Sequence, residues 1–212
     1  MKAFISALLR NLVWLVPSLM LAGPGLDALY LGFTGVVLFG GLAIACVIDP
    51  ISFARKDGED RRSETRLSAL LLLIFMVSAL DIGRLHAMPR VDEGPRAAAT
   101  IALALAYALR TLTIGTNRYF SGVLVIQKER GHHVVDVGPY AWVRHPGNLS
   151  AMLIVLCMPL SAGSWLALPL GALAALVVLE RTAREDRFLS EHLSGYPSYA
   201  ARVRFRLVPG LF

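Results

Sequence analysis

The segment NLSAMLIVLCMPLSAGSWLALPLGALAALVVLE, residues 148–180, holds two apolar stretches that are separated only by Ala162, Gly163 and Ser164. Such a short join between two helix-length stretches predicts an antiparallel helical hairpin. The first arm, at about 148–162, is short for a full bilayer crossing, because the hydrocarbon core takes about 20 apolar helical residues to cross. We therefore expect this arm to tilt or to lie at a shallow depth.

Four more apolar stretches precede the hairpin, at about 4–22, 29–48, 67–83 and 97–117. Of the 212 residues, 56% are hydrophobic and 17% are charged, whereas soluble domains carry about a quarter charged residues. With the second arm of the hairpin, at about 164–180, the sequence predicts an all-α, polytopic membrane bundle of about six transmembrane helices. We expect the first stretch to be a membrane helix rather than a cleaved signal peptide.

Lysine and arginine residues are unevenly distributed between the polar segments. If the N-terminus is cytoplasmic, the opposite side holds only Arg84, Arg90 and Arg96, and nearly all other basic residues are cytoplasmic. Because positive residues collect on the cytoplasmic side, we predict an integral membrane protein, in the cell or inner membrane if prokaryotic, with both termini in the cytoplasm. The net charge of +6 then indicates attraction to lipid headgroups rather than to nucleic acid.

The chain divides into N-terminal transmembrane helices, 1–117, and a C-terminal region, 118–212, that holds the polar residues able to carry chemistry. The C-terminal region consists of a polar loop, the hairpin and a charged amphipathic tail. Cys46 and Cys157 lie in apolar runs without His or Cys at metal-ligand spacing. We predict that both are small hydrophobic residues and that the protein has no metal site.

Two polar stretches flank the hairpin, and each contains a pattern with a physical meaning. Pro146 suits the first position of a helix, where its missing N–H costs nothing. His145 would then lie at the mouth of that helix, beside free backbone donors that favour an anionic group. Arg181 and Glu185 are four residues apart and share one helical face. Because the hairpin returns the chain to its starting side, both stretches are expected to converge on one cytoplasmic pocket.

These residues form a combined motif: Gly138-Pro139-Tyr140, Arg144-His145-Pro146, the hairpin, Arg181-xxx-Glu185-Asp186-xx-Leu189, and Gly195-Tyr196-Pro197-Ser198-Tyr199. The motif resembles the isoprenylcysteine carboxyl methyltransferase family over roughly residues 120–210. The resemblance implies a membrane enzyme that transfers a methyl group from S-adenosylmethionine to a lipophilic acceptor. It favours the carboxylate of an isoprenylcysteine-like substrate as that acceptor, and membrane lipid as the surroundings.

The resemblance also implies site residues. The positions that match the family's cofactor-binding residues are Gln127, His132, His133, Val134, Val135, Tyr140, His145, Pro146, Gly147, Asn148 and Glu185. Arg181 matches the arginine that meets the substrate, and it is the predicted catalytic residue. Asn148 stands where the family usually has Tyr, so hydrogen bonding is retained there but stacking is lost.

The chemistry of these residues agrees with methyl transfer to an anion. Such a transfer needs alignment and removal of water more than acid–base help, and the Arg181 guanidinium suits a carboxylate. Alternative functions are methylation of a phospholipid amine or a small thiol, a membrane reductase that uses a nicotinamide cofactor, and a non-enzymatic bundle or transporter. Arg110 and Asp81 lie near or within apolar segments, where they could line a path for a lipophilic tail.

Overall fold

The computed structural model describes residues 23, 26–47, 58–121, 124–208 and 210. Within these ranges the chain forms α-helices and short 3-10 and π-helical turns, without any strand. The predicted all-α fold is therefore confirmed for the described part of the chain. The first predicted membrane segment, 4–22, lies outside it.

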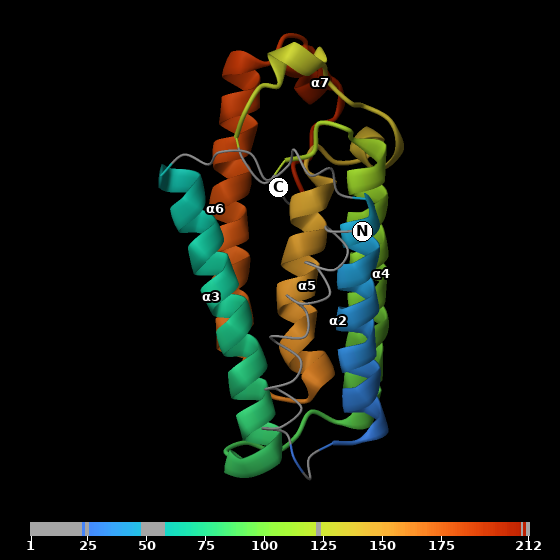
Figure 1. The fold of residues 1–212 in the computed structure, drawn as a ribbon, viewed down its shortest axis with the longest axis vertical. Coiled ribbons are helices and arrows are strands. Elements are labelled where there is room, and N and C mark those ends of the chain that lie inside the picture. The colour runs from blue at the N-terminus through green and yellow to red at the C-terminus, as the bar shows by residue number, and fades with distance from the viewer. Residues whose placement is uncertain (1–22, 24–25, 48–57, 122–123, 209, 211–212) are drawn as a thin grey trace.

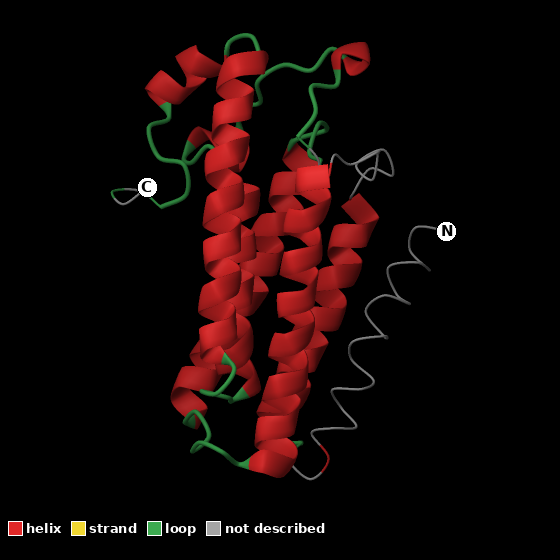
Figure 2. Ribbon diagram, turned by 90° about the vertical axis from the view of Figure 1, so that its left-hand side faces the viewer, coloured by secondary structure: helices red, strands yellow, loops and turns green. Residues whose placement is uncertain are grey.

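The α-helices of the described residues are α2 (Ala28–Val47), α3 (Gly58–Leu80), α4 (Glu93–Thr116), α5 (Pro146–Ala162), α6 (Leu168–His192) and α7 (Tyr196–Arg202). Helices α2 to α6 run along the long axis of the molecule, and α7 lies at one end with the polar loops (Figures 1 and 2). A π-helical turn, Asp81–Leu85, continues α3. Helix α5 is central, because it contacts α2, α3, α4 and α6.

Two of these helical segments are long and apolar enough to cross a membrane, Thr65–Leu85 and Glu93–Thr116. The segments Ala28–Ile44 and Pro146–Ala162 are apolar but shorter. Helix α5, with 17 residues, is about 25 Å long at 1.5 Å per residue, whereas the hydrocarbon core is about 30 Å thick. The number of membrane crossings and the orientation of the bundle remain predictions.

Helices α5 and α6 form the predicted hairpin. Gly163 ends α5 with φ of 99°, a left-handed conformation that glycine adopts without strain. Gly171 then allows α6 to lie directly against α5, since an added Cβ would be only 2.6 Å from the carbonyl oxygen of Val155. Buried side chains from α2 to α6 complete one apolar core around this contact. The hairpin is thereby held as one unit at the centre of the bundle.

Helix α6 is longer than its apolar arm. The sequence predicts that the arm ends at about residue 180, but the helix continues to His192. Hydropathy marks where the apolar side chains end, whereas the backbone hydrogen bonds continue beyond that point. Arg181 and Glu185 therefore lie on the same rigid helix as the hairpin, and the first part of the predicted tail is helical.

Ion pairs and hydrogen bonds fix the opposite end of the bundle. Asp27 accepts hydrogen bonds from Nη1 and Nη2 of the buried Arg96, both at 2.8 Å, and Arg90 pairs with it at 3.2 Å. The Arg96 hydrogen bond is the largest cause that lowers the pKa of Asp27, to about 2. Asp81 is buried and accepts a hydrogen bond from Ser164 Oγ at 2.6 Å. Asp81 therefore anchors the turn of the hairpin, far from the polar loops.

Candidate cofactor site

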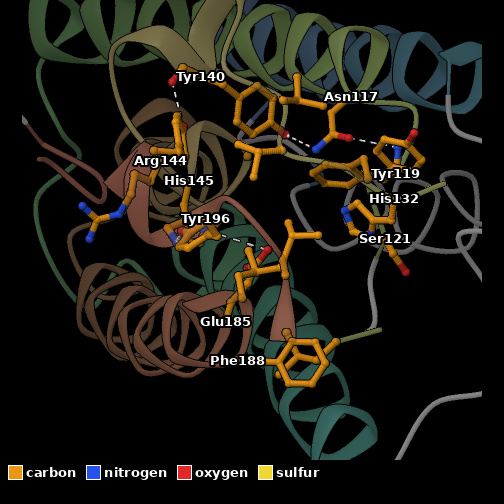
Figure 3. A pocket seen from close by; sticks show the side chains of 18 of the residues that line it. Asn117, Tyr119, Ser121, His132, Tyr140, Arg144, His145, Glu185, Phe188 and Tyr196 are labelled. Atoms are coloured by element: carbon orange, nitrogen blue, oxygen red, sulfur yellow. Dashed lines mark hydrogen bonds and ion pairs between the residues drawn. The ribbon is translucent and has the colours of Figure 1, made fainter. Parts of the chain in front are cut away.

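A cavity with polar walls lies where α4 ends, α5 begins and α6 approaches α7. Its volume is about 750 Å³, including the part that is open to solvent. Figure 3 shows Glu185, His145 and Tyr196 on one side of this polar cavity, and Tyr119 and His132 on the other. The two polar stretches that flank the hairpin both contribute to its walls, so they meet in space.

Most residues that the family resemblance implies for the cofactor line the polar cavity: His132, His133, Val134, Val135, Tyr140, His145, Gly147, Asn148 and Glu185. Gln127, Pro146 and Arg181 are not among the lining residues. Gln127 donates a hydrogen bond to the carbonyl oxygen of Tyr119 at 2.9 Å, which supports the loop behind the cavity. Pro146 is buried at the start of α5. The assignment of Gln127 and Pro146 to the cofactor, and of Arg181 to the substrate as the catalytic residue, stays a prediction.

Glu185 provides the acidic group of the polar cavity. Its Oε2 accepts a hydrogen bond from the Asn148 amide at 2.8 Å, and its Oε1 lies 3.8 Å from His145 Nδ1. Burial raises the pKa of Glu185, but the neighbouring His145, the charge of Arg181 and the Asn148 amide outweigh burial and lower the pKa to about 2. Glu185 is therefore ionised at neutral pH and suits an ammonium group or sugar hydroxyls. Asn148 orients it directly.

The start of α5 forms the floor of the polar cavity. The helix begins at Pro146 with His145 as its N-cap residue, as the sequence predicts. The first-turn N–H groups of an α-helix lack intrahelical acceptors and lie at the positive end of the helix dipole. Gly147 follows, and an added Cβ there would lie 2.7 Å from Cε2 of Phe120. Glycine at this position therefore allows the Phe120 ring to pack on the helix start.

An aromatic wall faces Glu185 across the cavity. The rings of Tyr119 and His132 are stacked with centroids 4.4 Å apart, and Tyr119 Oη lies 2.9 Å from His133 Nδ1. Burial, His133 and Arg130 lower the pKa of His132, so its ring is neutral at neutral pH. Such a flat aromatic wall suits a planar heterocycle.

Asp186, next to Glu185, organises the cavity wall and was not among the predicted site residues. Its carboxylate accepts hydrogen bonds from Arg144 at 2.9 and 3.2 Å, from Tyr196 at 2.8 Å and from Arg206 at 2.9 Å. His145 Nε2 lies 3.0 Å from its Oδ1. The Glu-Asp pair in the motif was the available signal, since Glu185 lines the cavity and Asp186 lies behind it.

A second, apolar cavity lies inside the bundle between α2, α3, α4 and α5, with a volume of about 920 Å³ including its open part. Arg110 is the one charged group among the described residues that line it. Its Nη1 donates a hydrogen bond to the carbonyl oxygen of Gly147 at 3.0 Å, and its guanidinium carbon lies 5.9 Å from the centroid of the Phe120 ring. Because Gly147 and Phe120 line the polar cavity, these three residues form the boundary between the two cavities.

The described helices form a bundle that has a charged, hydrogen-bonded cavity at one end, and two of them are long and apolar enough to cross a membrane. Residues 98–191, from α4 to α6, match the model of the isoprenylcysteine carboxyl methyltransferase (ICMT) family. The match confirms the predicted resemblance to that family over this part of the chain. A comparison with curated proteins found no match.

The matched family indicates the general class of function. The family consists of membrane-integral methyltransferases, which argues against the reductase and non-enzymatic alternatives. The match begins at residue 98, so it includes α4, which the sequence-based division assigned to the N-terminal helices. That inclusion agrees with the structure, because α4 contributes Arg110 and the loop after it contributes Asn117 and Tyr119.

Proposed function

We propose that the protein transfers the methyl group of S-adenosylmethionine to the carboxylate of a lipophilic acceptor, best represented by an isoprenylcysteine-like molecule. The observation that carries this proposal is the hydrogen bond between Arg110 and Gly147. It joins a residue of the apolar cavity to a residue of the polar cavity, and this supports a guanidinium that would act on the polar head of a lipophilic acceptor at the boundary. A polar cofactor and an apolar acceptor each have a matching cavity on opposite sides of this boundary.

The polar cavity has the groups that S-adenosylmethionine requires. Ionised Glu185 would hold its ammonium group or ribose hydroxyls, and the first turn of α5 would receive its carboxylate. The stacked Tyr119 and His132 rings would cover the adenine. When bound, the cofactor supplies an electrophilic methyl group: a new C–O bond forms, the C–S bond breaks, and its electron pair remains on the sulfur.

The residues at the boundary favour a carboxylate acceptor over an amine. The positive charge of Arg181 acts on Arg110 and on Glu185. Positive charge at Arg110, reinforced by the charge of Arg181, attracts an anion and repels a protonated amine. A carboxylate arrives already deprotonated, so the side chains act by holding the reacting groups in line and by excluding water. The apolar cavity would accommodate the lipid tail.

A transfer assay with labelled methyl tests this function. The purified protein in nanodiscs is given S-adenosylmethionine labelled in the methyl group, with a farnesylated cysteine analogue as acceptor. We expect base-labile label in the lipid fraction, and none when the same analogue carries a blocked carboxylate. Transfer to a lipid amine or a thiol, without transfer to the carboxylate, would contradict the proposed acceptor. Arg181→Ala is expected to abolish acceptor turnover while S-adenosylhomocysteine still binds.

We also propose that the polar cavity faces the cytoplasm, where the cofactor is available. The uneven distribution of basic residues supports this orientation, and the segment between α4 and α5 lies at the end of the bundle that carries α7 (Figure 1). A tag placed after Phe212 should be accessible to a membrane-impermeant reagent only from the cytoplasmic side. Labelling only from the opposite side would reverse the topology.

A further inference from the structure

Asp186 is buried behind the polar cavity, with 6% of its surface exposed. It neighbours Glu185 on α6, but successive residues of a helix point about 100° apart, so Glu185 lines the cavity whereas Asp186 faces the loop before α5. Of its partners, Arg144 and Arg206 carry positive charge, and the Tyr196 hydroxyl donates to it at 2.8 Å. The carboxylate is thus fully engaged by donors without any contact with the cavity.

His145 lies between two carboxylates. Its Nε2 is 3.0 Å from Asp186 Oδ1, and its Nδ1 is 3.8 Å from Glu185 Oε1. A neutral imidazole carries a proton on only one nitrogen, so its lone pair would face one of these carboxylates. His145 is 4% exposed, which leaves little room for water to separate the charges. The geometry therefore favours the doubly protonated ring.

The remaining groups around His145 are compatible with a positive ring. Tyr196 Oη lies 3.2 Å from Nε2, and burial together with the charge of Asp186 raises the pKa of Tyr196, so its hydroxyl stays protonated. Burial alone lowers the pKa of His145, but the hydrogen bond to Asp186 and the nearby carboxylate of Glu185 outweigh burial and raise it. Charged groups from several elements surround His145, Asp186 and Glu185. These groups are Arg144 from the loop before α5, Arg181 from α6, Arg110 from α4 and Arg206 from the C-terminal segment.

The same network holds the C-terminal segment 203–206 against His145. The main-chain N–H groups of Arg144 and His145 donate to the carbonyl oxygens of Phe205 and Arg206, both at 2.9 Å. The Arg144 guanidinium, which Asp186 orients, donates to the carbonyl oxygens of residues 203 and 204 at 2.9 and 2.8 Å. These hydrogen bonds hold the C-terminal segment against the loop that carries His145, on the side away from the polar cavity.

We propose that Asp186 is a positioning residue that keeps His145 doubly protonated, with its Nδ1–H directed toward Glu185 and the polar cavity. As an imidazolium, His145 is a permanent donor and does not act as a general base. Its charge also holds Glu185 ionised in the orientation that a cofactor would meet. The consequence for cofactor binding rests on the proposed function, but the protonation of His145 does not.

Nitrogen-15 histidine spectroscopy on the full chain in detergent tests the protonation directly. The chain has five histidines, and His145→Gln assigns the signal of His145. The wild-type ring is expected to carry protons on both nitrogens at neutral pH. In Asp186→Asn its pKa should fall by at least about one unit. A neutral His145 ring in the wild type would overturn the proposal without any variant.

Two further variants separate positioning from general disruption. Asp136→Asn removes a carboxylate at the same end of the bundle, where Asp136 pairs with Arg202 at 2.8 Å, and should leave the titration of His145 unchanged. Arg206→Gln removes a cation from Asp186 but keeps the carboxylate, so His145 should remain charged. A neutral His145 ring in Arg206→Gln would overturn the role of Asp186. An unchanged pKa of His145 in folded Asp186→Asn would overturn it as well.

The pH dependence of S-adenosylhomocysteine binding gives the functional readout. The affinity of the wild type should be flat between about pH 6 and pH 8, whereas that of Asp186→Asn should fall as pH rises through the lowered pKa of His145. A parallel pH profile in both proteins would overturn the role of Asp186. Absence of wild-type binding at every pH would contradict the proposed function, while the histidine spectra would still decide the role of Asp186.

Discussion

Gly147 and Phe120 pack directly against each other at the boundary between the polar and apolar cavities, and the contact exists because Gly147 has no side chain. An added Cβ would lie 2.7 Å from Cε2 of Phe120 and 3.5 Å from Cγ2 of Thr113. Arg110 holds the same residue through its carbonyl oxygen. The start of α5 is thus fixed by an aromatic ring and a guanidinium, both from the chain around the end of α4.

Gly147→Ala should therefore displace the Phe120 ring and weaken cofactor binding. A loss in S-adenosylhomocysteine affinity of about 10-fold or more is expected, because overpacking costs on the order of 1–3 kcal/mol. Phe120→Leu in the same protein should restore much of the affinity, since the smaller side chain makes room for the added methyl. Titration calorimetry on the four proteins of this double-mutant cycle measures the coupling. Additive losses would show that the two residues act independently.

Arg110→Gln should reduce the use of the acceptor far more than the binding of the cofactor. The amide keeps a donor for Gly147 but loses the charge that would attract a carboxylate, so kcat/KM for the acceptor should fall by about 100-fold, or about 2.7 kcal/mol. Cofactor affinity should change by less than about threefold. Steady-state kinetics and calorimetry on the same preparation provide the comparison. An equal loss in both would place Arg110 in the cofactor site instead.

Ionised Glu185 should stabilise the folded protein at moderate pH. Its pKa is lowered from 4.5 to about 2, so its contribution is present above about pH 4.5 and is lost as pH falls toward 2. Asp186 and Asp27 also have lowered pKa values and lose their contributions in acid. Thermal unfolding should therefore show Tm falling in acid, with a smaller fall in Glu185→Gln. Identical pH profiles for the two proteins would contradict an ionised, paired Glu185.

The opposite end of the bundle should affect stability but not binding. Asp27→Asn leaves the buried Arg96 without its carboxylate, and removal of one partner from a buried ion pair costs about 3 kcal/mol. Because Asp27 is itself partly exposed, a loss of about 2 kcal/mol is expected. Thermal unfolding should detect a lower Tm, while S-adenosylhomocysteine affinity stays unchanged. A change in affinity would indicate coupling along the bundle.

The fold could be predicted largely from hydropathy, because apolar stretches and the short join at Gly163 dictate helices and a hairpin. The same signal could not reveal that α6 continues to His192, since a helix that leaves the apolar layer keeps its backbone hydrogen bonds while its side chains become polar. Hydropathy also gave no indication that α5 would be the central helix. The close approach of α5 and α6 at Gly171 was hidden as well, because it depends on side-chain volume.

The candidate site could be located from the motif but not resolved into roles. The sequence places Glu185 and Asp186 side by side, and only the turn of α6 shows that one faces the polar cavity and the other holds His145. The contact between Asn148 and Glu185 was equally hidden, because it joins two helices. Arg110 stood out as a charge within an apolar segment, but its position between two cavities depends on packing around Gly147.

The central claim is that the polar cavity binds S-adenosylmethionine through Glu185. Calorimetric titration of S-adenosylhomocysteine into the detergent-purified protein tests it most directly, with Glu185→Ala and the control Asp136→Asn measured in parallel. We expect saturable binding to the wild type and to Asp136→Asn, and loss of binding in Glu185→Ala with the fold retained. Absence of binding to a folded wild type, or undiminished binding to Glu185→Ala, would contradict the account.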